Sequence, residues 1–245
     1  MAEDAPVPVP MIRPPEDGAL QAPLPPGVHQ RLLNLDDLPA LHRLHDQVRV
    51  ALPDASLFNL FGGAESFFTT HFGERGISLG LFRGDTLLAY GALTRPRAED
   101  ADNYAAALGW PADRTGAVAL LSAAMVSPHE RRRRLHGALI EARLRQAAQD
   151  GVAEVLARAA PANAVSRQSL MGRGFRLVWL GAHAGGLMRH VFLRPVQPPG
   201  PLGAGAPLRW ISADDLAAQR AALNEGWVGV EVHPWDGALG FTPGP

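Results

Sequence analysis

The spacing of apolar residues changes repeatedly along the chain, and each change predicts a new element of secondary structure. Between residues 38 and 48 they recur every three or four positions, which is typical of one face of a helix. Between 77 and 81 they alternate with other residues, and between 117 and 126 they form a nearly unbroken run; both patterns favour strands. The chain is thus predicted to contain strands at 30–33, 77–81, 86–93, 117–126, 152–159, 175–180 and 187–193, and helices at 34–52, 58–72, 103–108, 131–150 and 163–172.

The order of these elements predicts an α/β fold. A strand, a long helix and another strand follow one another between residues 117 and 159, and a crossover helix of this kind normally joins two parallel strands. Short turns such as Gly84-Asp85 join other strands and predict antiparallel hairpins. We therefore expect a central mixed sheet flanked by helices.

Stretches rich in Pro and Gly divide the chain into four parts. Residues 1–27 hold eight of the 22 prolines and are predicted to be a disordered arm. Residues 28–195 form the expected domain, residues 196–207 a linker, and residues 208–245 an extension with one helix and one strand. Because so short an extension cannot bury its own apolar face, we expect it to dock on the domain or on a partner subunit, and we favour a homodimer.

Composition narrows the class of protein. The 23 basic and 24 acidic residues nearly cancel, so neither a nucleic acid nor a membrane surface is an expected partner. No apolar run reaches the ~20 residues of a membrane-spanning helix, and the first residues lack the pattern of a secretory signal, so a cytoplasmic location is expected. The lack of Cys excludes thiolate chemistry, and the nine scattered His predict no metal site.

One junction between a strand and a helix carries the clearest chemical signal. Residues 126–139 read Val-Ser-Pro-His-Glu-Arg-Arg-Arg-Arg-Leu-His-Gly-Ala-Leu. Free backbone N–H groups and the positive end of a helix dipole bind phosphate oxygens. Four consecutive Arg oppose that dipole unless an anion is bound, so the segment predicts a phosphate site.

Other motifs lie at fixed distances from this junction. After the next predicted strand comes an Asn, followed by a Ser three residues later and by Gly-Phe beginning eleven residues after the Asn. The full set comprises Val126, Pro128, Arg131, Leu135, Asn163, Ser166, Gly174 and Phe175. Together these residues resemble the signature of the GCN5-related N-acetyltransferase superfamily over residues 28–195.

The resemblance implies a coenzyme A site. In that family the amides of the turn hold the pyrophosphate, the end of the fourth strand pairs with the pantetheine arm, and the splayed fourth and fifth strands form the acyl slot. A backbone N–H at Val126 would also face the oxyanion that forms during attack. For Asn163 a plain helix cap is the alternative. Carried over by position, the cofactor-binding residues are Met125, Val126, Arg131, Arg132, Arg133, Arg134, Leu135, His136, Gly137, Asn163 and Ser166.

The sequence departs from the family pattern at three points. Arg134 and His136 occupy positions where the family has small residues, so we expect coenzyme A binding to be retained but altered. Leu170 replaces the Tyr that often protonates the leaving thiolate. The fourth strand also lacks the carboxylate that often serves as base, and Ser122 is its only polar residue.

The catalytic residues are therefore not identified by the motif. Ser122 and Tyr104 are the weak candidates, and His71, Glu74 and His129 are conceivable bases from flanking segments. The resemblance implies an acyl-CoA-dependent N-acyltransferase that passes an acetyl group from acetyl-CoA, or an acyl group from another acyl-CoA, to an amine of a small molecule or peptide. The alternative is a catalytically weak or inactive domain that binds a CoA thioester as a sensor or scaffold.

Overall fold

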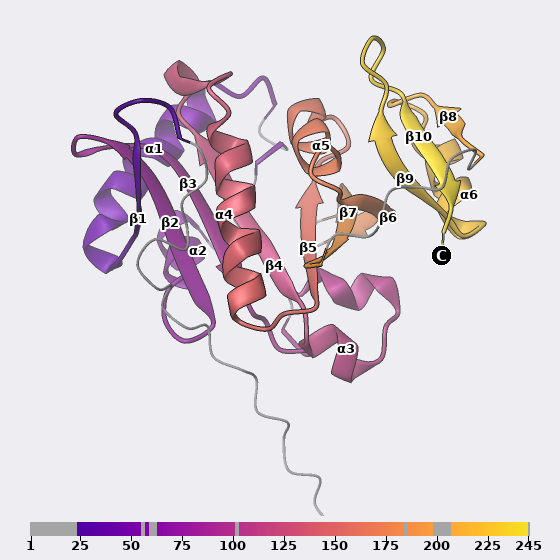
Figure 1. Cartoon of the computed structure of the whole chain (residues 1–245), viewed down its shortest axis with the longest axis horizontal. Coiled ribbons are helices and arrows are strands. Elements are labelled where there is room, and N and C mark those ends of the chain that lie inside the picture. Colours follow the sequence, from indigo (N-terminus) through magenta and orange to yellow (C-terminus); the bar gives the residue numbers. More distant parts are fainter. Residues whose placement is uncertain are drawn as a thin grey trace, which may run out of the picture.

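The chain folds around one large sheet, seen in a computed structural model that describes residues 24–54, 57–58, 63–100, 103–183, 186–197 and 207–244 (Figure 1). The predictions for the N-terminal arm and the linker fall largely outside these residues. The strands are β1 (His29–Leu32), β2 (Gly76–Arg83), β3 (Thr86–Thr94), β4 (Ala119–Val126), β5 (Glu154–Ala159), β6 (Arg176–His183), β7 (Leu187–Pro195), β8 (Arg209–Ile211), β9 (Trp227–Val232) and β10 (Leu239–Pro243). The helices are α1 (Leu38–Val50), α2 (Ala64–Thr69), α3 (Ala112–Gly116), α4 (Leu135–Gln149), α5 (Ala164–Met171) and α6 (Leu216–Asn224), with short 3-10 helices η1 (Leu35–Asp37), η3 (Tyr104–Leu108) and η4 (Pro128–Glu130).

The described strands lie in the order β1-β2-β3-β4-β5-β7-β6-β9-β10-β8. The pair β4–β5 is parallel, as the crossover through α4 predicts, and the other neighbours are antiparallel. The predicted central mixed sheet flanked by helices is confirmed.

Helices cover both faces of the sheet. Successive residues of a strand point to opposite faces, and on β3 Tyr90 contacts Phe68 of α2 whereas Gly91 lies against Arg143 of α4. Helices α1 and α2 therefore lie on one face and α4 on the other, where Figure 1 shows it crossing β3 and β4. The two faces form separate apolar clusters, so a ligand on one face is screened from the other by the sheet.

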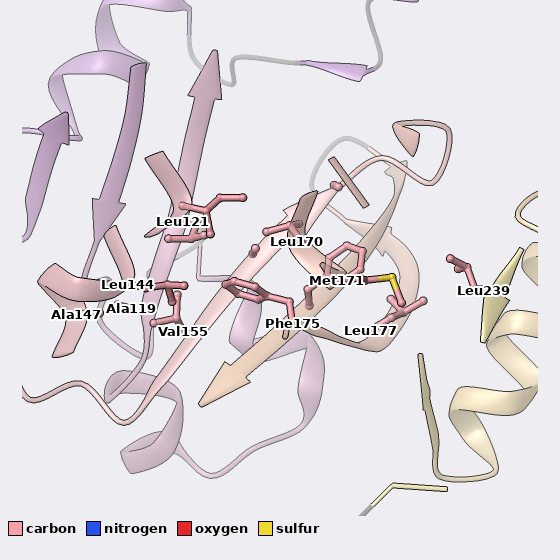
Figure 2. Close-up of a cluster of buried hydrophobic side chains, with 14 of the residues drawn as sticks. Ala119, Leu121, Leu144, Ala147, Val155, Leu170, Met171, Phe175, Leu177 and Leu239 are labelled. Atoms are coloured by element: carbon pink, nitrogen blue, oxygen red, sulfur yellow. The ribbon is translucent and has the colours of Figure 1, made fainter. Parts of the chain in front are cut away.

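The C-terminal extension packs against the domain of the same chain. Strand β9 lies beside β6 in the sheet, and α6 packs on β6. Leu239 of β10 joins the buried cluster that contains Met171 and Leu177 (Figure 2). At 25 cal/mol per Å² of buried apolar surface, a fully buried Leu contributes roughly 2 kcal/mol, so this contact helps to hold the extension in place.

A buried polar pair makes a second link to the extension. His190 of β7 is fully buried, and its Nε2 lies 2.9 Å from Oε1 of Gln219 in α6. Because that amide oxygen can only accept, Nε2 of His190 carries the proton, and its Nδ1 has no partner among the described residues. The pKa of His190 is lowered to about 4, and desolvation is the main cause. The positive charge of Arg167 lowers this pKa as well, whereas the hydrogen bond to Gln219 raises it.

The predicted elements differ from the observed ones mainly at their ends. The long helix begins at Leu135 rather than at residue 131, because Arg131 is extended and Arg132 and Arg134 have left-handed φ angles of 64° and 60°. Pattern reasoning also missed α3, β8 and β10, which are five residues or shorter. None of the helices in the described ranges has the length and apolarity that a bilayer crossing demands.

Acidification should destabilise the protein through His190. The unfolded chain binds a proton on this ring below about pH 6.5, whereas the folded chain does so only near pH 4. The stability that the neutral ring contributes is therefore present above pH 6.5 and is lost as the pH falls towards 4, by on the order of 3 kcal/mol. Urea unfolding at about pH 7 and about pH 4.5 measures this loss.

The matched variant is His190→Gln, which keeps a hydrogen-bonding side chain but cannot titrate. We expect its free energy of unfolding to fall less on acidification than that of the wild type. If both proteins lose the same free energy, the buried imidazole is not the cause.

Candidate functional site

The site begins where two neighbouring strands separate. Strands β4 and β5 pair at Ala119, Leu120 and Leu121 and no further, although β4 continues to Val126. Ser122 forms a β-bulge, since Ala92 pairs with Ala123 and the next residue of β3 pairs with Leu121. A bulge bends a strand, and this one lies at the point where β4 leaves β5.

A buried Arg of helix α4 holds the bulge. Nη1 of Arg143 donates to the carbonyl oxygens of Ala92 and Ala123, at 3.0 and 2.9 Å, and Nε donates to that of Leu139. The guanidinium lies against Gly91, where a side chain's Cβ would come within 3.0 Å of it. Desolvation lowers the pKa of Arg143 to about 10, so it remains charged at neutral pH.

Beyond the bulge, no strand of the described residues pairs with one edge of β4. The N–H of Ser127 donates to the carbonyl of Leu88, which makes Ser127 and Leu88 a hydrogen-bonded pair of the antiparallel ladder. By alternation, the N–H and C=O of Val126 and Ala124 point away from β3, into the gap that β5 leaves. No strand among the described residues pairs with them, so they can pair with an extended ligand.

The side chains of β4 have different surroundings. That of Met125 is buried in the cluster formed with α1 and α2, so a ligand in the gap would meet the backbone near this residue and not the thioether. That of Val126 is half-buried beside the cluster on the α4 face.

The Arg-rich loop, residues 127–134, joins the end of β4 to the start of α4. Glu130, which is buried, accepts two hydrogen bonds from Arg83 of β2, at 2.7 and 3.1 Å, and forms an ion pair with Arg133. The Arg83 hydrogen bond, with the nearby Arg133, holds the pKa of Glu130 below its usual value. This carboxylate thus anchors the loop to the sheet and partly neutralises one of its four Arg.

The remaining three Arg are free to meet an anion. Arg131, Arg132 and Arg134 are exposed, and none of their side chains has an ion-pair or hydrogen-bond partner in the described ranges. A left-handed residue directly before a helix turns successive N–H groups toward one side, which forms a concave anion site. Left-handed φ angles at two non-Gly residues are also a strain that typically accompanies a functional site.

The first turn of α4 supplies mostly packing. Leu135 is buried in the cluster on the α4 face. Gly137 lies against the side chain of Arg173, and a Cβ at position 137 would come within 1.8 Å of Nη2 of that Arg. His136 is half-buried in the same turn. Leu135 and Gly137 could therefore offer a ligand backbone N–H groups only.

Helix α5 contributes the second predicted motif. Oδ1 of Asn163 accepts a hydrogen bond from the N–H of Ser166 at 3.0 Å, which is a helix cap. Ser166 is half-buried on the first turn. Leu170, at the position where the family often has Tyr, is buried in the core.

A cavity of about 710 Å³ opens on the face opposite α4. Ser122 and Arg158 line the cavity. They directly follow Leu121 and Ala157, the last residues that pair between β4 and β5, so the cavity reaches the point where these two strands separate. Ser122 contacts the hydroxyl of Thr94. The full lining is Ser66, Phe67, Thr70, His71, Phe72, Glu74, Arg75, Thr94, Arg95, Pro96, Asp100, Tyr104, Ser122 and Arg158.

His71 is the cavity residue best placed to accept a proton. Its Nδ1 lies 2.7 Å from the hydroxyl of Tyr90, and the hydroxyl of Ser78 donates to its carbonyl. Desolvation, with a smaller contribution from Arg143, lowers the pKa of His71 to about 4, so the ring is neutral at pH 7.

The other predicted candidates are less suited to proton transfer. The hydroxyl of Tyr104 is buried and donates to the carbonyl of Leu156 at 3.2 Å. Glu74 lines the cavity but is exposed, and His129 is exposed in η4, outside the cavity lining. Four of the five, all but His129, thus meet at one cavity.

Sequence reasoning missed Arg143, whose guanidinium holds the bulge at the site. For Arg143 a signal existed, because it lies four residues after Leu139 on the apolar face of the predicted helix.

Comparison with known proteins finds solved structures with the same fold at low sequence identity. No family model matches the chain, and no curated protein matches it. The ribosomal-protein-S18-alanine N-acetyltransferase from Escherichia coli is 18% identical with a TM-score of 0.51, and the match covers 71% of this chain and 96% of that one.

Two further solved structures are similar. A GCN5-related N-acetyltransferase from Kribbella flavida is 18% identical, with a TM-score of 0.50 and coverage of 69% and 98%. NAA60 of Arabidopsis thaliana, solved in complex with acetyl-CoA, is 15% identical, with a TM-score of 0.53 and the same coverage of 69% and 98%. At these identities the likeness concerns the fold, and it confirms the fold that the sequence motifs indicated.

The strain in the Arg-rich loop can be measured at Arg134. A residue other than Gly in the left-handed conformation costs about 1–2 kcal/mol of stability. Replacement by Gly removes this cost, but Gly also has more conformational freedom in the unfolded chain, which offsets part of the gain in stability. We expect Arg134→Gly to be more stable than Arg134→Ala by about 0.5–1 kcal/mol in urea unfolding. Both variants remove the same charge, so equal stabilities would show that the left-handed conformation is not strained.

Proposed function

We propose that the chain is an acyl-CoA-dependent N-acyltransferase that passes an acetyl group directly to the amine of a small molecule or peptide. The observation that carries this proposal is the unpaired edge of β4 at Ala124 and Val126. It lies between a loop with three unpartnered Arg and a cavity with a neutral imidazole. These are the three parts that such a transfer needs: an anion site, a slot for an extended chain and an acceptor pocket.

The residues present fit an acyl-CoA. Arg131, Arg132 and Arg134, with the amides at the start of α4, would hold the pyrophosphate. The edge groups of Ala124 and Val126 would pair with the amides of the pantetheine arm. When bound, the acyl-CoA supplies an acyl group activated as a thioester.

His71 would accept the proton that the amine loses. His71 lines the cavity, and its low pKa keeps the ring unprotonated above about pH 5. Tyr90 holds the ring through Nδ1, and Ser78 holds the backbone of the residue by donating to its carbonyl. No proton donor to the leaving sulfur is required, since a thiol with a pKa near ~8.5 leaves as a thiolate.

The same cavity weighs against a binding-only role. A sensor of the CoA thioester needs the anion site and the edge of β4 but not a cavity with a buried, unprotonated base beside them. Transfer to an amine uses all three parts.

The cofactor site can be tested by isothermal titration with acetyl-CoA. We expect Arg131→Ala to weaken binding about 10-fold, because a charge-assisted contact to phosphate is lost. Arg133→Ala is the matched control, since Glu130 already pairs with that guanidinium, and its effect should be smaller. Absence of binding by the wild type to both acetyl-CoA and free CoA would overturn the proposal.

The role of His71 can be tested by CoA release with a panel of amines. We expect His71→Gln to lower kcat by ~10²-fold or more, because a positioned base typically contributes 10²- to 10⁴-fold, while acetyl-CoA affinity is retained. Glu74→Gln is the comparison variant, because Glu74 is the other candidate base that lines the same cavity. A larger loss in Glu74→Gln than in His71→Gln would assign the base to Glu74 instead.

A further inference from the structure

The imidazole of His71 has neutral neighbours and a nearby cation. Nδ1 lies 2.7 Å from the hydroxyl of Tyr90, and the ring of Phe67 packs edge-on against the imidazole, with the two centroids 4.6 Å apart. No carboxylate of the described residues forms a hydrogen bond or ion pair with the ring. Burial lowers the pKa of His71, and the positive charge of Arg143 lowers it further.

The other ring nitrogen of His71 is open to a ligand. Nε2 has no hydrogen-bond partner in the described ranges, and it is not one of the partnerless side-chain nitrogens that are sealed from solvent. When Nδ1 donates its proton to the oxygen of Tyr90, Nε2 keeps a free lone pair. Because His71 lines the cavity, an amine bound there would meet Nε2.

These surroundings disfavour an ammonium ion beside Nε2. An ammonium ion at this position would lie next to the apolar ring of Phe67 and within the field of Arg143. Of the two carboxylates among the described lining residues, Asp100 pairs with Arg75 at 2.6 Å, and Glu74 is exposed, so water screens its charge. The site therefore favours an amine that enters without a charge.

We propose that the acceptor is an aromatic amine, which binds in its neutral form with its ring against Phe67 and Phe72. The proposal rests on the proposed function, because it takes this cavity as the acceptor site. Both Phe are half-buried and line the cavity, and about 710 Å³ is of the size that holds small organic ligands. Aromatic rings attract one another beyond the effect of the area that they bury.

An aromatic amine also suits a weak base. The lone pair of the amine attacks the thioester carbon, the C–N bond forms, the C–S bond breaks and CoA leaves as a thiolate, while the proton of the nitrogen passes to Nε2 of His71. Because an aromatic ring withdraws the lone pair, this nitrogen becomes strongly acidic as the bond forms. An alkylammonium ion, with a pKa of about 10, would transfer its proton to an imidazole of pKa about 4 with an equilibrium constant of only about one in a million.

The experiment compares 4-methylaniline with 4-methylbenzylamine, which carries the same ring but an alkylamine. Turnover of the full chain is measured as CoA release from acetyl-CoA at about pH 7, and binding is measured by isothermal titration. We expect kcat/KM to be higher for 4-methylaniline by about 10-fold or more. The reason is that only about one part in a thousand of an amine with a pKa of about 10 is neutral at this pH.

A pH series tests whether the neutral amine is the species that reacts. Between about pH 7 and about pH 9, His71 stays neutral, Tyr90 stays protonated because burial raises its pKa, and Arg143 stays mostly charged. We expect kcat/KM for 4-methylbenzylamine to rise about 10-fold or more over this range, as its neutral fraction rises. The value for 4-methylaniline should change little, and equal rises for both amines would contradict the inference.

Phe67→Leu tests the contact with the aromatic ring. The variant keeps an apolar side chain but loses the ring, so we expect the Kd of 4-methylaniline to rise about 5-fold while the affinity for acetyl-CoA is kept. Phe58→Leu is the matched control, since Phe58 is a half-buried Phe that packs on the same cluster but is not one of the described residues that line the cavity. An equal rise in Kd in both variants, at similar Tm, would assign the effect to the packing of the cluster and overturn the ring contact.

The outcomes separate the two proposals. Release of CoA with 4-methylbenzylamine at about pH 7 that equals or exceeds release with 4-methylaniline would overturn the inference but leave the transferase intact. Binding of 4-methylaniline that Phe67→Leu weakens, without any CoA release, would support the aromatic site and contradict the transfer. If 4-methylaniline neither binds at millimolar concentration nor releases CoA, the inference is overturned, whatever the titration with acetyl-CoA shows.

Discussion

The site depends on one buried guanidinium. Arg143 reaches through from α4 and donates to two carbonyls, of Ala92 and Ala123, that face each other across the bulge in β4. A neutral or shorter side chain would leave both buried carbonyls without a partner, at a cost of about 1–3 kcal/mol for each. Because the bulge sets the point where β4 leaves β5, this contact fixes the open edge and the cavity together.

Positive charge gathers around that opening although the whole chain is nearly neutral. The net charge is −1, yet the Arg-rich loop, Arg143 and Arg158 lie near the part of β4 that leaves β5. Arg143 also acts on the cavity, since it lowers the pKa of His71 beyond the effect of burial. A cationic environment favours a bound anion at the Arg-rich loop.

Local signals in the sequence predicted most of the fold. The apolar run of β4, the crossover helix and the Asn163 cap depend on neighbouring residues, so pattern and spacing reveal them. The left-handed φ angles of Arg132 and Arg134 could not be predicted, because Arg does not favour that region and the loop imposes it. The motif located the Arg-rich loop, but the cavity beside β4 required three-dimensional contacts.

Amide hydrogen exchange at the open edge of β4 tests the central claim most directly. The N–H groups of Ala124 and Val126 lie where no strand of the described chain pairs with them. Addition of CoA or acetyl-CoA should slow their exchange strongly, while amides of β9 in the C-terminal extension keep their rates. Slower exchange at Ala124 and Val126 is the result that the account predicts. Unchanged exchange at both residues under saturating CoA would contradict it.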